Sequence, residues 1–129
     1  MDTETVLYLS RADVEGVGLS MREVIDALER MFVEKGEGRV EMPPKPGIHT
    51  RPDAFIHAMP AYIASQSAAG MKWISGYPEN QQKGLPYISG LLVLNDPETG
   101  IPIAVMDATW LTAQRTGAAT AVAAKMLAR

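Results

Sequence analysis

The sequence predicts an α+β domain in which N-terminal helices pack on a mostly antiparallel sheet. Helix-capping signals and apolar residues at helical spacing lie before residue 37, β-rich runs joined by turn residues occupy 54–106, and a helical pattern returns from 107 onward. The 129 residues can bury one core and are too few for two full domains.

The first third of the chain is expected to hold one short strand and two helices. Residues 6–9 form a β-rich run. Ser10 and Ser20 are each followed three residues later by an acidic residue, which is the spacing of a capping box. The second box opens a longer helix whose apolar side chains recur every three or four residues, and Gly36 and Gly38 are expected to end it.

The middle of the chain is expected to begin as an irregular, partly extended segment and continue as strands. Residues 42–53 contain four prolines, which donate no hydrogen bond to a sheet. Strands are predicted at 54–62 and 69–75, followed by a polar loop at 77–84. Alternation along the second strand puts Lys72 on the opposite face from its two neighbours.

The last third is expected to form a hairpin and a long helix. Residues 87–94 and 101–106 are β-rich runs, and the turn between them ends at Gly100. A helical pattern then runs from Asp107 to Arg129 with no glycine, asparagine or proline stop signal. We therefore expect the domain to be incomplete.

Composition excludes several classes of protein. The chain has no cysteine, so it cannot contain a disulfide scaffold, a thiolate metal site or a cysteine nucleophile. Its net charge of -3 and pI of about 5.3 argue against nucleic-acid binding, and its basic residues are scattered singly. No apolar run is long enough for a membrane span. We expect a soluble, cytoplasmic protein without a nucleic-acid or membrane partner.

Three isolated cations are the most informative polar residues. Arg115 and Asp107 are the only charged residues between 101 and 124, so Arg115 either pairs with an acidic group or grips an anionic ligand. Lys72 either faces solvent from a half-covered sheet or is desolvated, with a lowered pKa that suits proton transfer. Lys45 is held between prolines, which suits a positioned ligand but also occurs in loops without function.

Histidines and common motifs add less. His57 lies within a predicted strand, where a hydrogen-bonded core histidine is the plainer interpretation. No metal site is expected, because the two histidines lack suitably spaced carboxylates. The sequence contains no nucleophile elbow, P-loop or Gly-x-Gly-x-x-Gly pattern. The residues alone thus suggest a domain that gathers Lys45, Lys72 and Arg115, with His57, around a small anion.

Several motifs resemble those of the ornithine cyclodeaminase and mu-crystallin family, which includes archaeal alanine dehydrogenases and ketimine reductases. The resembling segments are Ala-Met-Pro-Ala-Tyr (58–62), Gly-Met-Lys-Trp (70–73), Tyr-Pro-Glu-Asn (77–80), Lys-Gly-Leu-Pro (83–86), Leu-Asn-Asp-Pro-Glu-Thr-Gly (94–100), Ala-Val-Met-Asp-Ala-Thr (104–109) and Thr-Ala-Gln-Arg-Thr (112–116).

The resemblance implies a domain organisation. In the family, a substrate-binding and dimerisation domain partners a Rossmann domain that binds NAD or NADP. Residues 1–129 would be an incomplete form of the first domain, with the long C-terminal helix leading into a Rossmann domain that this chain lacks. The family's catalytic aspartate belongs to that missing part, so the resemblance implies that this chain alone binds no cofactor and is inactive.

The resemblance also assigns roles to individual residues. Lys72 matches the family lysine that contacts substrate and assists proton transfer, and it is the predicted catalytic residue. Lys45 matches a cation that grips the substrate carboxylate. Arg115 lies where the family contacts both substrate and cofactor, and Thr116 follows it in the cofactor contact.

Two positions depart from the family pattern. His57 stands where dehydrogenase-like relatives carry an arginine, which weakens a second carboxylate clamp. Tyr87 replaces a small hydroxyl residue beside the nicotinamide, which puts that cofactor contact in doubt.

The function implied for the parent enzyme is hydride transfer between a nicotinamide and an L-amino acid or its imine, with a homodimer or larger homo-oligomer as the working form. The imine would be hydrolysed, as in an alanine dehydrogenase, or attacked by the substrate's own side-chain amine, as in a cyclodeaminase. The alternative function is a non-catalytic module, like mu-crystallin, that binds a small anion or supports assembly.

Overall fold

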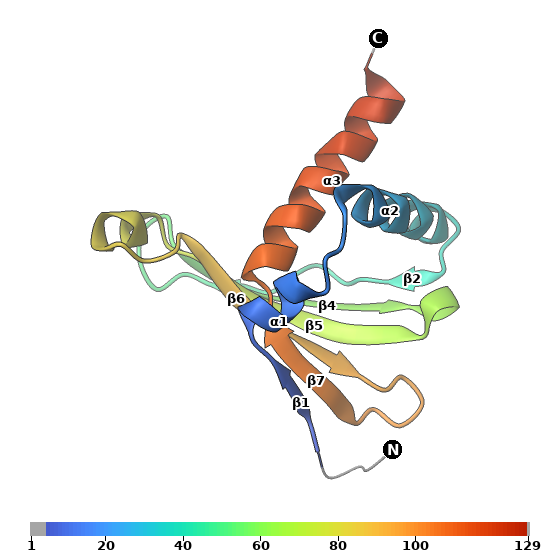
Figure 1. Cartoon of the computed structure of the whole chain (residues 1–129), viewed down its shortest axis with the longest axis horizontal. Helices are drawn as coiled ribbons and strands as arrows, with labels where there is room; N and C mark the ends of the chain where they lie inside the picture. Colours follow the sequence, from blue (N-terminus) through green and yellow to red (C-terminus); the bar gives the residue numbers. More distant parts are fainter. Residues whose placement is uncertain (1–4, 129) are drawn as a thin grey trace.

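The computed structural model describes residues 5–128, and its helices lie on one face of a seven-stranded sheet (Figure 1). Its helices are α1 (Arg11–Gly16), α2 (Met21–Gly36) and α3 (Thr109–Leu127), with short 3-10 turns η1 (Ala64–Gln66) and η2 (Pro78–Lys83). No helix in this part of the chain has the length and apolar character needed to cross a membrane.

The sheet has the order β1-β7-β6-β5-β4-β2, and β3 also pairs with β4. Only the β1–β7 pair is parallel, and the other pairs in the described residues are antiparallel. The predicted α+β fold with a mostly antiparallel sheet is therefore confirmed. The strands are β1 (Leu7–Leu9), β2 (Val40–Glu41), β3 (Gly47–Ile48), β4 (Phe55–Ile63), β5 (Ala68–Gly76), β6 (Ile88–Asn95) and β7 (Pro102–Asp107).

Both predicted capping boxes form. The Ser20 hydroxyl accepts a hydrogen bond from the Glu23 backbone N–H, and the Glu23 carboxylate accepts one from the Ser20 N–H at 2.8 Å. These bonds satisfy donors that the first turn of α2 would otherwise leave free. Ser10 caps α1 in the same way. The C-terminal half of α3 packs against α2, where Lys125 pairs with Glu29 at 2.7 Å.

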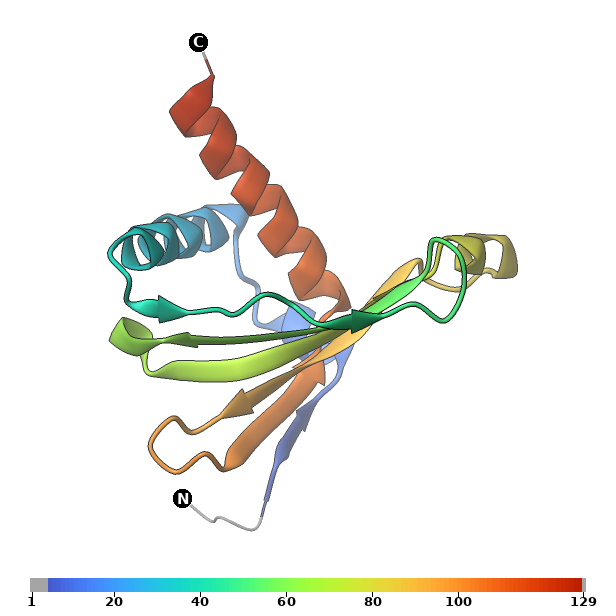
Figure 2. The ribbon, with the colours of Figure 1, turned by 180° about the vertical axis from the view of Figure 1, so that it is seen from behind.

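The structure corrects three details of the predicted elements. The extended part of residues 42–53 includes a strand, because Gly47 and Ile48 follow Pro46 and pair with β4 as β3 (Figure 2). The polar loop at 77–84 contains η2. The last helix begins two residues later than expected, because Asp107 ends β7 and its carboxylate accepts hydrogen bonds from Thr109.

The two faces of the sheet differ in what covers them. Ile74 and Ala104 lie on the face beneath the helices and are 4% and 7% exposed. Trp73 and Leu91, which lie opposite each other on the other face, are 43% and 38% exposed. We call these the helix face and the open face. Lys72 alternates with Trp73, so it lies on the helix face.

Gly90 marks the tightest contact between two central strands. A Cβ atom on Gly90 would lie 2.2 Å from the carbonyl oxygen of Trp73 and 2.7 Å from Cδ1 of Ile74. The carbonyl belongs to the β5–β6 ladder and cannot move aside without breaking it. A side chain at position 90 is therefore excluded, and the space above this glycine is filled by Ile74.

We predict that Gly90→Ala destabilises the chain by about 1–3 kcal/mol, because the added methyl overpacks the sheet. Gly36→Ala is the matched control: no atom lies within 4 Å of its would-be Cβ, and alanine should stabilise α2 by about 0.5–1 kcal/mol. Urea unfolding of the two variants measures the difference. Equal stability of Gly90→Ala and the unchanged chain would contradict the contact described here.

Candidate functional site

Lys72 lies at the centre of the sheet and is half-buried. In the strand register it stands opposite Met59 on β4 and Leu92 on β6, so its flanking side chains are apolar. Burial lowers the pKa of Lys72 from its ordinary value of 10.5 to about 8, with smaller contributions from the positive charges of Arg115 and Lys45. Of the two interpretations of Lys72, the structure supports the desolvated lysine.

Lys45 lies across β4 from Lys72, on the side of β3. Pro46 accepts a hydrogen bond from the Ala58 backbone N–H at 3.0 Å, which continues the β3–β4 pairing by one residue. Continued one residue further, that register brings Lys45 level with Met59, the residue that stands opposite Lys72. Lys45 and Lys72 thus flank one methionine.

Arg115 reaches this region from α3. It is exposed, and its positive charge is close enough to lower the pKa of Lys72. Asp107, its proposed structural partner, bonds to the backbone N–H and hydroxyl of Thr109 at 3.0 and 3.1 Å. None of the ion pairs within residues 5–128 includes Arg115, Lys45 or Lys72. We call these three residues the cation cluster.

A cluster of cations without carboxylate partners has the chemistry to bind an anion. Like charges repel, and a half-buried lysine is costly unless a counter-charge completes it. A carboxylate placed among these groups would receive charge-assisted hydrogen bonds from a guanidinium and two ammonium groups. Because the pKa of Lys72 is about 8, this amine can both hold and release a proton close to neutral pH.

His57 extends the site along β4. It lies on the same face as Met59, two residues away, and opposite Ile74. Its ring stacks on Phe55 with the centroids 4.3 Å apart, and His49 meets it edge-on at 6.4 Å. Burial lowers the pKa of His57 below its ordinary 6.5, as do the positive charge of Lys45 and the neighbouring His49, and this shift favours the neutral imidazole.

A glycine makes room for this histidine. A Cβ atom on Gly47 would lie 2.2 Å from Cδ2 of His57 and 2.9 Å from its Nε2. The imidazole therefore lies over the backbone of β3, held between that strand and Phe55. Sequence reasoning missed Gly47, Phe55 and Met59 as site residues. The alternation of Phe55, His57 and Met59 along one strand was the available signal, but it does not tell which face the helices cover.

The predicted cofactor contacts lie at different distances from the cluster. Thr116 follows Arg115 on α3 and is exposed, so both could meet a ligand together. The carbonyl of Tyr87 accepts a hydrogen bond from Tyr77, five residues beyond Lys72 on the chain. At the rise of an extended strand, this separation corresponds to about 16 Å. The structure thus does not bring Tyr87 next to Lys72, and the role predicted for Tyr87 stays a prediction.

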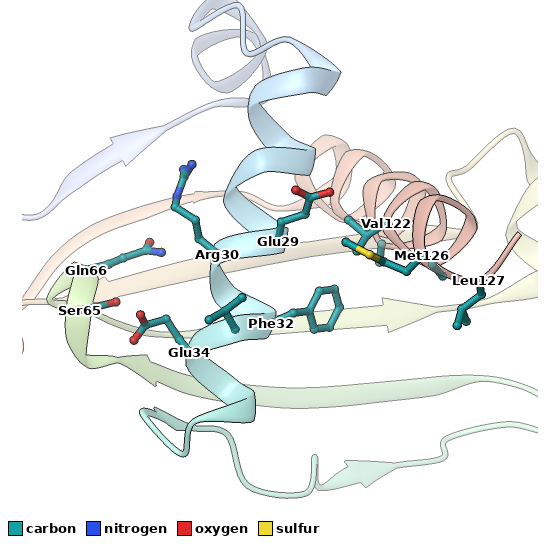
Figure 3. A pocket seen from close by; sticks show the side chains of 12 residues that line it. Glu29, Arg30, Phe32, Glu34, Ser65, Gln66, Val122, Met126 and Leu127 are labelled. Atoms are coloured by element: carbon teal, nitrogen blue, oxygen red, sulfur yellow. The ribbon is translucent and has the colours of Figure 1, made fainter.

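A groove lies away from the cation cluster. It has a volume of about 1120 Å³ and runs between the C-terminal halves of α2 and α3 (Figure 3). Its apolar side chains include Phe32, Val122 and Met126, and two of its acidic side chains, Glu29 and Glu34, are already paired with basic residues. The groove lacks a group of free cations like the one around Lys72, so we take the cation cluster as the candidate site.

We predict that the side-chain amine of Lys72 titrates with a midpoint near pH 8. Arg115→Met should raise this midpoint, because removing a neighbouring positive charge favours the protonated amine. NMR of the lysine Cε signals across pH 6–11 measures both values, and Arg22→Met on α2 is the control that should leave them unchanged. A Lys72 midpoint at 10.5 would rule out the desolvated site.

Known proteins match both the sequence and the fold. Residues 4–129 match the ornithine cyclodeaminase/mu-crystallin family. The chain is 52% identical to the nodulation efficiency protein NfeD of Rhizobium meliloti over 122 residues, which cover 95% of this chain and 38% of that protein.

Two solved structures share the fold. The Δ(1)-pyrroline-2-carboxylate reductase of Thermococcus litoralis, in complex with NADH and L-proline, has a TM-score of 0.92 and 46% identity. An archaeal alanine dehydrogenase dimer with bound NAD has a TM-score of 0.88 and 44% identity. Each match covers 96% of this chain and 38% of the other, so the chain spans well under half the length of these relatives. The chain belongs to the ornithine cyclodeaminase/mu-crystallin family.

Proposed function

We propose that this chain is the substrate-binding and dimerisation part of an NAD- or NADP-dependent enzyme that oxidises an L-amino acid to its imine or reduces the imine. The observation that carries the proposal is the unpaired cation cluster around half-buried Lys72. Two relatives support it, because one is a reductase in complex with NADH and L-proline and the other is an alanine dehydrogenase with NAD.

In this proposal the chain's own residues position the substrate. Lys45 and Arg115 hold its carboxylate, so that the Cα atom is fixed relative to the hydride donor or acceptor. Lys72 exchanges a proton with the amino or imino nitrogen, which suits an amine with a pKa of about 8. Fixed geometry of this kind supplies a large part of the rate in such reactions.

The cofactor contacts fall on α3. Arg115 and Thr116 are adjacent and exposed, and Arg115 has no ion-pair partner within the described residues, so both fit a dinucleotide lying over the start of the helix. When bound, the nicotinamide supplies or accepts the hydride. The relatives are more than twice the length of this chain, and we propose that the 129 residues alone bind no cofactor and are inactive.

The open face of the sheet supports the dimer. Tyr8, Trp73 and Leu91 are 67%, 43% and 38% exposed there, and no helix in the described residues covers them. Apolar side chains grouped on one face of a soluble domain indicate an interaction surface. We propose that two copies of the chain meet at this face, as suggested by the dimeric archaeal alanine dehydrogenase.

Pyruvate tests the anion site directly. We expect the 129-residue chain to bind it, and Lys72→Met and Arg115→Met each to weaken binding by about tenfold or more, because each removes a charge-assisted hydrogen bond. Calorimetric titration measures the affinity. Lys83→Met, in η2, is the control and should bind like the unchanged chain. Unchanged affinity in both site variants, with folding intact by circular dichroism, would overturn the proposed function.

Light scattering tests the dimer. We expect the unchanged chain to have the mass of a dimer and Trp73→Glu to shift it toward the monomer, because a charge would have to be buried in the interface. Val17→Glu, at a position that is 68% exposed just after α1, is the matched control and should stay dimeric. A strictly monomeric unchanged chain would contradict this assembly.

A further inference from the structure

Lys72 differs from every other lysine of the chain in its surroundings. It is half-buried at the centre of the sheet, with Met59 opposite it on β4 and Leu92 opposite it on β6. The chain has five lysines, and the other four are exposed: Lys35, Lys45, Lys83 and Lys125. An ammonium group loses hydration between apolar neighbours, which favours the neutral amine.

Two neighbouring cations add to the effect of burial on Lys72. Burial lowers the pKa of its amine to about 8, and the positive charges of Arg115 and Lys45 contribute to the shift. At pH 8 about half of the Lys72 side chains therefore carry a neutral amine with a free electron pair. A lysine that is desolvated and lies beside other cations is an activated nucleophile. The guanidinium of Arg115 keeps its proton and has no such reactivity.

The same two cations can bring an electrophile to this amine. The carbonyl carbon of a 2-oxo acid is bonded directly to its carboxylate carbon. If Arg115 and Lys45 hold the carboxylate, the carbonyl carbon is fixed one bond away from the anchored group, beside the Lys72 nitrogen. This step rests on the proposed function, because it uses the cation cluster as a carboxylate site.

We propose that Lys72 is a nucleophile that forms a covalent imine with a 2-oxo acid whose carboxylate is held by Arg115 and Lys45. The neutral amine attacks the carbonyl carbon, a C–N bond forms, and the electron pair of the C=O bond moves to the oxygen. The nitrogen gives up its two protons, the oxygen leaves as water, and a C=N bond remains. No oxidant, reductant or nicotinamide takes part, so the 129 residues suffice for the reaction.

Reductive trapping with pyruvate tests this chemistry. When the chain is incubated with pyruvate and sodium cyanoborohydride at pH 8, it should gain one reduced adduct, and peptide mapping by mass spectrometry should place the adduct on Lys72. The four exposed lysines are the internal control, and they should react at least about tenfold more slowly because their amines are hydrated and unanchored to the 2-oxo acid. Similar labelling of all five lysines would overturn the proposal.

A charge-conserving substitution separates binding from bond formation. Lys72→Arg keeps the positive charge and removes the nucleophilic amine, so it should bind pyruvate within about threefold of the unchanged chain and form no adduct at position 72. Lys83→Met, in η2, is the control and should be trapped like the unchanged chain. If Lys72→Arg gains the same adduct while circular dichroism shows it folded, Lys72 is not the nucleophile.

The outcomes distinguish this proposal from the function on which it rests. If pyruvate binds and depends on Lys72 and Arg115 while cyanoborohydride traps no adduct, the anion site stands and the covalent step is wrong. If pyruvate neither binds nor reacts, the proposed function itself fails.

Discussion

The register between β4 and β5 is the constraint on which the rest of the molecule depends. Nine residues of each strand pair without interruption, from Phe55 with Gly76 to Ile63 with Ala68. This ladder sets Lys72 opposite Met59 and His57 opposite Ile74. A slip of one residue would turn every side chain of one strand to the other face and move Lys72 away from α3.

The chain fixes this register by pairing bulky residues with residues that leave space. The ring of Phe55 lies over Gly76, and Ile74 occupies the room above Gly90. At the other end of the ladder, η1 and the left-handed Ser67 (φ 45°) close the connection between the strands. The fit of these side chains thus disfavours other strand registers. The same contacts position residues of the candidate site.

In the proposed function, the cation cluster lowers the stability of the fold and favours the binding of substrate. A lysine on the helix face gives up hydration, and no acidic neighbour within the described residues compensates it. Some exposed charges are paired, as Glu34 is with Arg39 through two hydrogen bonds at 2.8 and 2.9 Å. In the proposed function, an anionic substrate is the counter-charge of the three cations in the cluster.

In the proposed function, the two faces of the sheet have different tasks. The helix face carries Lys72, His57 and Phe55, and it is partly shielded by α3. The open face carries exposed apolar side chains such as Trp73 and few charges. Lys72 and Trp73 are adjacent residues of β5, so their side chains point to opposite faces of the sheet.

The sequence by itself determined the local elements and the identity of the unusual residues. Capping boxes at Ser10 and Ser20, alternation around Lys72 and the turn before Ile101 all depend on near neighbours, and all formed as expected. Lys45, Lys72 and Arg115 stood out because each was an isolated charge. These signals have periods of two to four residues, so a short window contains them whole.

Only the tertiary structure decided which residues meet and on which side. Alternation showed that Lys72 and Trp73 face opposite ways, but not which of them α3 would cover. The pairing of Gly47 with His57 joins residues on either side of a turn, and the proline-rich segment did not indicate which of its extended residues would pair. Arg115 comes near Lys72 because a helix 37 residues later in the chain packs back on the sheet. Such contacts depend on non-local packing, which the sequence does not display in any one segment.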